Sequence, residues 1–188
     1  MSRILILDDE EPILRSLRRL LKTVPCRSGD VTYPLEIELF TDPAAALEKA
    51  RHKSFDLFLS DYRMPGMDGV EFLRQVKAIQ PDGARLILSG YADLNGLMRA
   101  VNEVGIDRFI AKPWNDYELV TALAQSLSGR ALIMENRRLA DLARLAAGSV
   151  SAEELERRRL EAMEPGITHV NWGPDGSVIL DPDLMDLE

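Results

Sequence analysis

The chain has 188 residues, of which 46% are hydrophobic and 29% are charged, and its formal net charge is −8. This composition is that of an ordinary folded protein, and it excludes a disordered or fibrous one. The negative charge opposes binding to a phosphate backbone. Residues 129–188 alone hold seven Arg, no Lys and twelve Asp or Glu, so we expect no DNA binding in either part of the chain.

No stretch of the sequence has the roughly 20 apolar residues needed to cross a bilayer, and the first residues lack the pattern of an export signal. We therefore expect no membrane insertion and a cytoplasmic protein. The single cysteine, Cys26, has no partner for an internal disulfide or a Cys-based metal site, and we expect an inert thiol.

Short apolar runs alternate with amphipathic stretches over the first two thirds of the chain. Five strands are predicted, at residues 4–7, 37–40, 57–59, 86–88 and 109–111. Helices are predicted after each of the first four strands, including one that begins at Asp42-Pro43, one after Asp68-Gly69 and one at Leu94–Val104. Short parallel strands need helical crossovers, so the pattern predicts an α/β fold with a doubly wound, five-stranded parallel sheet.

Two segments depart from this regular alternation. Residues Val24–Leu35, with Pro25, Gly29 and Pro34, are predicted to form a long loop. The helical periodicity that starts at Asn115 continues far beyond the sheet, and Gly129 is a possible interruption.

We therefore expect a domain at residues 1–128 and a C-terminal extension at residues 129–188. In the extension, the long helix continues to about residue 147. A second helix at about 151–164 begins with the capping-box sequence Ser-Ala-Glu-Glu. A small terminal β-hairpin is predicted at about 167–180, on either side of a Gly-Pro-Asp-Gly turn.

Carboxylates follow two of the predicted strands. Asp8 and Asp9 come directly after the first strand, and Asp61 follows the third. The carboxyl ends of parallel strands share one edge of the sheet, which is where such folds place their reactive site. Three like charges at one edge are unfavourable unless a cation joins them, and oxygen ligands of this kind suit Mg²⁺. The pattern predicts a magnesium site.

The other two strands that reach this edge end in Ser89 and Lys112. A carboxylate nucleophile, a hard divalent cation, a hydroxyl and an ammonium group are together the parts needed to stabilise charge on a transferring phosphoryl group. Each residue alone is better explained by turn chemistry or a helix cap. Their joint placement at the ends of four strands favours phosphoryl transfer.

Four motifs occur in order along the chain, each at the end of a predicted strand. They are Ile-Leu-Ile-Leu-Asp8-Asp9-Glu10, Ser60-Asp61-Tyr-Arg-Met-Pro65-Gly66-Met-Asp68-Gly69, Leu-Ser89-Gly90-Tyr91 and Phe109-Ile-Ala-Lys112-Pro113. Over about residues 2–128 the sequence resembles the receiver domains of two-component response regulators, the family of the chemotaxis regulator. The resemblance implies a flavodoxin-like fold with strand order 2-1-3-4-5.

The resemblance also implies roles for the residues at this edge. Asp61 would accept the phosphoryl group, and Ser89 and Lys112 would contact its oxygens. Asp9 and Asp61 would bind Mg²⁺ directly, Asp8 largely through water, and the backbone carbonyl of Arg63 would complete the protein ligands. The Lys112-Pro113 bond would be cis.

Switching in the family couples a hydroxyl to an aromatic ring, here Ser89 to Phe109. Phe109 considered alone is better explained as a plain core residue. Arg63 and Tyr91, together with Gly90, would lie along the approach to the phosphoryl group, and we hypothesise that they slow attack by water.

Two classes of function fit these residues. In the first, a sensor histidine kinase or phosphotransfer protein phosphorylates Asp61 and the chain then switches its contacts with a downstream protein of unknown identity. In the second, the chain is a stand-alone phosphate shuttle or sink in a phosphorelay. Parts of the sequence also resemble receivers joined to HD-type phosphodiesterases or to regulators of hydrogenase genes, but no output motif follows residue 128, so whether the chain is an enzyme is open.

The leucines of the extension lie close to heptad spacing, which favours a homodimer through the C-terminal extension over packing of the long helix back on the receiver. The leucines in question are Leu132, Leu139, Leu142 and Leu145.

Overall fold

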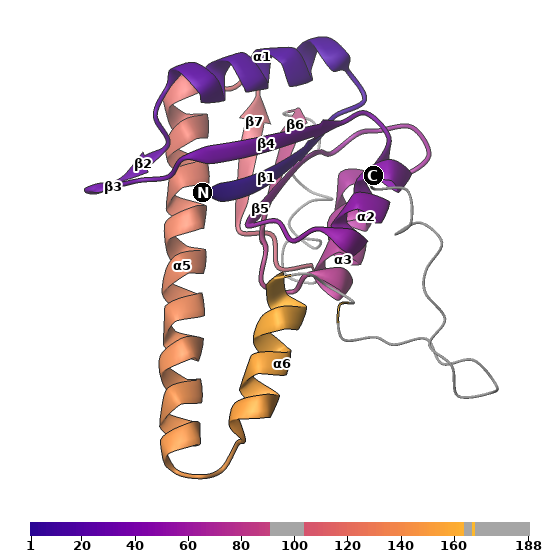
Figure 1. The fold of residues 1–188 in the computed structure, drawn as a ribbon. Helices are drawn as coiled ribbons and strands as arrows, with labels where there is room; N and C mark the ends of the chain where they lie inside the picture. Colours follow the sequence, from indigo (N-terminus) through magenta and orange to yellow (C-terminus); the bar gives the residue numbers. More distant parts are fainter. Residues whose placement is uncertain (91–103, 164–166, 168–188) are drawn as a thin grey trace, which may run out of the picture.

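The computed structural model describes residues 1–90, 104–163 and 167. Within them the chain forms a five-stranded parallel sheet with helices on both faces (Figure 1). Taken in chain order as strands 1 to 5, the strands lie in the order 2-1-3-4-5, which confirms the predicted α/β topology. The strands of this sheet are β1 (Ser2–Leu7), β4 (Leu35–Phe40), β5 (Leu57–Asp61), β6 (Ala84–Gly90) and β7 (Arg108–Lys112).

Each face of the sheet is covered by one pair of helices. The described helices are α1 (Glu11–Thr23), α2 (Pro43–His52), α3 (Gly69–Ile79), α5 (Asp116–Ala146) and α6 (Ala152–Met163). Side chains of α1 and α5 pack on one face, and side chains of α2 and α3 pack on the other. The helix predicted at Leu94–Val104 lies almost wholly outside the described residues. In the described part of the chain, no helix has the length and hydropathy of a membrane span.

Helix starts follow the capping residues that the sequence offers. The side chain of Asp42 accepts hydrogen bonds from the backbone N–H groups of Ala44 and Ala45 at the start of α2. Asp68 accepts one from the N–H of Glu71 at the start of α3. These bonds satisfy N–H groups that have no partner inside the helix, so both helices begin where they were predicted.

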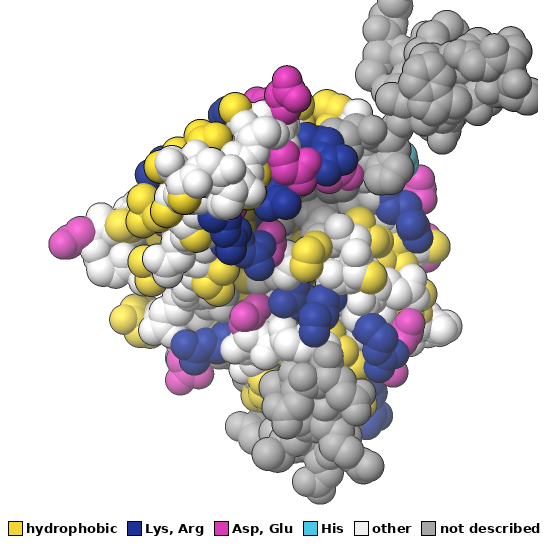
Figure 2. All heavy atoms as spheres, turned by 90° about the horizontal axis from the view of Figure 1, so that it is seen from below, with side chains coloured by type: hydrophobic (Ala, Val, Ile, Leu, Met, Phe, Trp, Pro, Cys, Tyr) yellow, Lys and Arg dark blue, Asp and Glu magenta, His cyan; other side chains and the backbone are white. Residues whose placement is uncertain are grey.

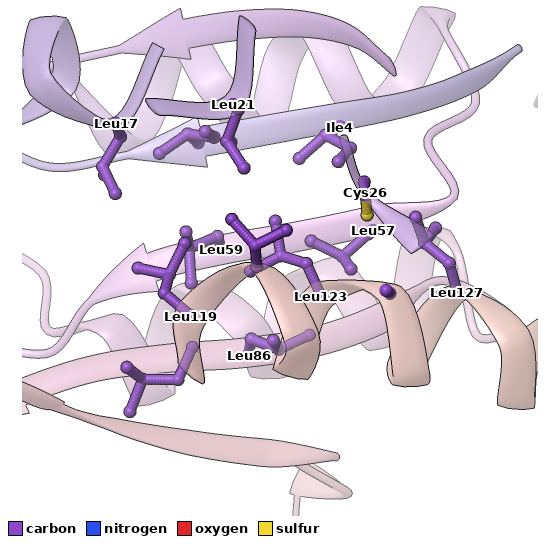
Figure 3. Packing of buried hydrophobic residues seen from close by; sticks show 14 of the residues in the cluster. Ile4, Leu17, Leu21, Cys26, Leu57, Leu59, Leu86, Leu119, Leu123 and Leu127 are labelled. Atoms are coloured by element: carbon purple, nitrogen blue, oxygen red, sulfur yellow. The ribbon is translucent and has the colours of Figure 1, made fainter. Parts of the chain in front are cut away.

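The central strands are buried on both faces, as their unbroken apolar sequences require. Ile4 and Ile6 of β1 point toward α1 and α5, whereas Leu5 and Leu7 point toward α2 and α3. Leu119, Leu123 and Leu127 of α5 pack against Leu57, Leu59 and Leu86 of the sheet (Figure 3). This two-sided packing fixes the strand ends, and therefore the side chains that follow them.

The segment predicted to be a long loop contains a small β-hairpin. Strands β2 (Arg27–Ser28) and β3 (Val31–Thr32) pair antiparallel around a turn in which Gly29 has a φ of +58°. The prediction of an irregular loop was wrong here because two-residue strands are too short to show a period of two. The Gly29-Asp30 pair at the turn is a signal that could have revealed it.

Helix α5 runs without a break past Gly129 and extends beyond the sheet, and α6 follows it after a short turn (Figure 1). Ser151 caps α6 by accepting a hydrogen bond from the N–H of Glu154 at 3.1 Å. Seen from below, Lys and Arg side chains lie among Asp and Glu rather than in one separate patch (Figure 2). All of the hairpin predicted at 167–180 except Ile167 lies outside the described residues.

One glycine should be essential to the fold beside the strand ends. A Cβ atom at Gly69 would lie 2.0 Å from the backbone oxygen of Asp61, whereas one at Gly129 would meet nothing within 4 Å. We expect Gly69→Ala to lower the free energy of unfolding by about 2 kcal/mol or more, because the backbone must shift. The control Gly129→Ala should raise it by about 1 kcal/mol through helix propensity. Urea unfolding measures both, and equal effects would contradict the account.

Candidate functional site

Four strands deliver polar side chains to one edge of the sheet. Asp61 ends β5 and lies opposite Leu88 of β6, and Lys112 ends β7 opposite Gly90. Asp8 follows β1 directly, and its N–H donates to the carbonyl of Phe40 at 3.2 Å. Because all these strands are parallel, their carboxyl ends bring together the groups that the sequence predicted.

The ammonium group of Lys112 lies between two carboxylates. Its Nζ is 2.8 Å from Oδ2 of Asp8 and 2.5 Å from Oδ1 of Asp61. The remaining oxygens are also held, since Oδ1 of Asp8 accepts the N–H of Glu10 at 2.9 Å and Oδ2 of Asp61 accepts the N–H of Arg63 at 2.8 Å. Every oxygen of both carboxylates therefore has a donor, which fixes their orientation.

The two carboxylates lie almost entirely out of contact with water. Asp8 is 0% exposed and Asp61 is 5% exposed. Burial raises the pKa of Asp8, although its hydrogen bonds from Lys112 and Glu10 act in the opposite direction. Burial lowers the pKa of Lys112, but its hydrogen bonds and charge interactions with Asp61 and Asp8 outweigh this effect and raise it above its ordinary value. Lys112 therefore stays charged at neutral pH.

The hydroxyl that was predicted as part of a switch lies at this end of the sheet, whereas the aromatic ring lies near the start of β7, opposite Ile87. Ser89 is buried, and its Oγ donates to the carbonyl of Gly90 at 3.2 Å. Phe109 is half-buried and packs against the core on the side of α2 and α3. The Lys112-Pro113 bond is cis, as expected. The coupled movement of Ser89 and Phe109 stays a prediction.

Part of the approach to Asp61 lies within the described residues. Asp9, Tyr62, Arg63 and Asp68 contribute to the lining of an open hollow of about 510 Å³ beside the strand ends. Arg63 is exposed and lines this opening. Tyr91, the other residue predicted along the approach, lies outside the described residues.

The magnesium site was predicted from three carboxylates, and the structure brings two of them together. Asp9 is exposed, and among the described residues no three His, Cys, Asp or Glu side chains are spaced to hold one metal ion. The donor chemistry and the charge balance nevertheless fit a divalent cation. Three acidic groups against the single charge of Lys112 leave two negative charges at the edge, and carboxylate oxygens are the ligands that Mg²⁺ prefers.

The sequence did not reveal some groups that shape this site. Gly69 was predicted only as part of a helix start, yet it allows α3 to pass within contact of the Asp61 backbone. The N–H groups of Glu10 and Arg63, which orient the two carboxylates, carry no sequence signal because every residue except proline has one.

The sequence model of the response regulator receiver domain matches residues 4–124. This match covers well over half of the chain, so the chain belongs to the receiver domain family of two-component response regulators. Members of this family interact with histidine kinases or phosphotransfer proteins, and they generally bind Mg²⁺ at the phosphorylation site.

The proteins similar to this chain include a transcriptional regulator and an uncharacterized protein of solved structure. The chain is 33% identical over 138 residues to the hydrogenase transcriptional regulatory protein HoxA of Cupriavidus necator, a match of 73% of this chain and 27% of HoxA. A solved structure of an uncharacterized protein from Neptuniibacter caesariensis is 39% identical, with a TM-score of 0.64 over 72% of this chain and 93% of that one.

A second solved structure is the signal receiver domain of an HD domain-containing protein from Pseudomonas fluorescens. It is 32% identical to this chain, with a TM-score of 0.61 over 69% of this chain and 97% of that one. The chain spans only about a quarter of the length of HoxA and of its counterpart in Bradyrhizobium diazoefficiens.

The raised pKa of Asp8 gives a prediction about stability and pH. A carboxyl whose pKa is higher in the folded state favours folding when protonated, and that contribution is lost as the pH rises through the folded-state pKa. Ionised Asp8 therefore costs stability at pH 7, while Lys112 still has Asp61 as a partner. We expect Asp8→Asn to raise the free energy of unfolding at pH 7, without divalent cations, by on the order of 1 kcal/mol.

The gain in unfolding free energy from Asp8→Asn should shrink as the pH falls toward the pKa of Asp8, because the wild-type carboxyl then becomes neutral too. Urea unfolding at a series of pH values measures this difference. A variant that is less stable than wild type at pH 7 would contradict the assignment.

Proposed function

We propose that Asp61 accepts a phosphoryl group from a histidine kinase or phosphotransfer protein, and that phosphorylation switches the contacts of this chain with a partner. The observation that carries this proposal is the placement of the Lys112 ammonium 2.5 Å from Oδ1 of Asp61 and 2.8 Å from Oδ2 of Asp8. A buried carboxylate with an adjacent fixed cation is a nucleophile whose phosphorylated product has a ready counter-charge.

The residues at the strand ends have separate tasks in this reaction. An oxygen of Asp61 attacks phosphorus, and the bond between phosphorus and the donor atom breaks as the donor leaves with the bonding electrons. The N–H of Arg63 holds the other oxygen and so orients the carboxylate. Lys112 and the Ser89 hydroxyl bind the oxygens of the incoming group in this proposal. Its support is that Ser89 lies on β6, which pairs with β5, and that Lys112 ends β7, which pairs with β6.

A magnesium ion at this edge would be held by Asp9 and Asp61, with Asp8 and the carbonyl of Arg63 nearby. It would supply positive charge to the phosphoryl oxygens during transfer. The two negative charges that Lys112 leaves unbalanced support this assignment.

The extension of α5 supports the further proposal of a homodimer. Leu132 is 65% exposed and Leu139 is 51% exposed, which is unfavourable for large apolar side chains in water. On the opposite side of the helix, Arg130 forms an ion pair with Asp56 at 2.6 Å, and Arg137 forms one with Asp82. The leucines lie two residues beyond these arginines, about 200° around the helix. The apolar stripe therefore faces away from the receiver and is free to pair with a second copy.

One experiment tests the phosphoryl site and the mode of signalling together. The full chain is incubated with acetyl phosphate and Mg²⁺, and its mass and its sedimentation are recorded. We expect wild type to gain one phosphoryl group and to change its assembly state, and Asp61→Asn to do neither. Asp30→Asn, an exposed carboxyl on the β2–β3 turn, is the matched control and should behave as wild type.

Phosphorylation that persists in Asp61→Asn would refute the phosphoacceptor assignment. A wild-type chain that takes up phosphate with no change in assembly or partner binding would instead favour the alternative, a phosphate shuttle or sink in a phosphorelay.

A further inference from the structure

A second hollow lies at the other end of α1, away from the strand ends that carry Asp61. It has a volume of about 470 Å³, within the range of ligand and peptide sites, and is formed by the last turns of α1, the β2–β3 hairpin and the start of β4. Apolar side chains such as Leu21, Val24 and Ile37 line it. We call it the α1–hairpin hollow.

The wall that closes this hollow is firmly attached to the domain. Cys26, just before β2, is buried in the core against Ile4, Leu57 and Leu127 (Figure 3). The N–H of Tyr33 donates to the carbonyl of Cys26 at 2.8 Å, which closes the base of the hairpin. The hollow is therefore a fixed feature of the surface and not a gap beside a loose loop.

The charge of the α1–hairpin hollow is opposite to that of the whole chain. Arg18 and Lys22 line it, both are exposed, and among the described residues neither has a carboxylate within ion-pair distance. No Asp or Glu is among its lining residues, although the chain has 31 acidic and 23 basic residues. An occupant that matches this surface must combine apolar side chains with negative charge.

The chain itself contains such a segment. Residues 181–188, which lie outside the described residues, have the sequence Asp-Pro-Asp-Leu-Met-Asp-Leu-Glu. Four acidic residues alternate there with Leu184, Met185 and Leu187, and no basic residue is present. The apolar side chains match the lining of the hollow, and the carboxylates match Arg18 and Lys22. A nucleic acid or a free phosphate would match only the cations.

The connection is long enough to allow this contact within one molecule. Thirteen residues, 168–180, separate Ile167 from the segment. An extended chain of that length spans up to about 45 Å. A domain of this size is roughly 35 Å across, so the connection spans more than the width of the domain.

We propose that residues 181–188 dock in the α1–hairpin hollow of their own chain. Leu184, Met185 and Leu187 contact its apolar lining, and Asp183 and Asp186 pair with Arg18 and Lys22. Burial of the apolar side chains supplies the attraction, while the two cations select an acidic segment over other apolar ones, because exposed ion pairs contribute little free energy by themselves. Docking covers the C-terminal half of α1 and makes that surface inaccessible to other proteins until the segment is displaced.

Amide NMR spectra of the full chain test this docking. Asp183→Lys/Asp186→Lys should shift the amide signals of residues around the hollow, such as Lys22, Thr32 and Tyr33. The control Glu153→Lys/Glu156→Lys makes the same charge changes at the same spacing on α6 and should leave these signals in place. Reversal of the partner charges by Arg18→Glu/Lys22→Glu in the tail variant should return the signals of Thr32 and Tyr33, which are not substituted, to their wild-type positions.

Alkylation of Cys26, the single thiol of the chain, gives a second readout, because this buried side chain reacts only when the hollow opens locally, and a docked segment must leave before it can open. If the docked state holds about two thirds of the molecules, Asp183→Lys/Asp186→Lys should speed alkylation about threefold. Shift changes confined to the substituted residues and their neighbours, an unchanged alkylation rate, or no restoration by the reversed charges would overturn the proposal. Shifts that depend on protein concentration would also overturn it, because they would place the segment on another copy.

Discussion

The arrangement at the reactive edge depends on one ammonium group placed between two buried carboxylates. Asp8 and Asp61 come from different strands and repel one another, and burial makes the repulsion stronger because water no longer screens it. Lys112 removes most of this cost by contacting both. It reaches them from β7, two strands from β5, so the order of strands in the sheet is itself a condition for the site. The core packing of α1 and α5 on one face and α2 and α3 on the other keeps those strand ends in place.

Much of this structure could be predicted from local patterns in the sequence. The strands are short apolar runs and the helices carry their caps, so the alternation of elements determined a parallel sheet and the edge at which Asp8, Asp61, Ser89 and Lys112 meet. What remained hidden was the direction of individual side chains. Nothing in the sequence says that Lys112 bridges Asp8 and Asp61 while the adjacent Asp9 stays exposed. The β2–β3 hairpin was missed because its strands have two residues each, and only their pairing and the burial of Cys26 identify it.

The two ends of the sheet hold different groups of interacting residues. The carboxyl ends of the strands hold the charged cluster, while Asp56 and Asp82, which precede β5 and β6, contact the arginines of the α5 extension. Strand β5 thus links the two, with Asp56 just before it and Asp61 as its last residue. These ion pairs hold the start of the extension beside the domain, and the continuous helix α5 sets the direction of its apolar stripe.

The most direct test of the central interaction is the unfolding free energy of Lys112→Met, measured without divalent cations alone and in combination with Asp8→Asn. Removal of the ammonium leaves two buried carboxylates without their shared partner, and such losses typically cost about 3–5 kcal/mol. We expect a loss of this size for Lys112→Met, and a partial recovery in the double variant that exceeds the effect of Asp8→Asn on wild type. A Lys112→Met protein as stable as wild type would contradict this expectation, because the carboxylates would then not depend on that cation.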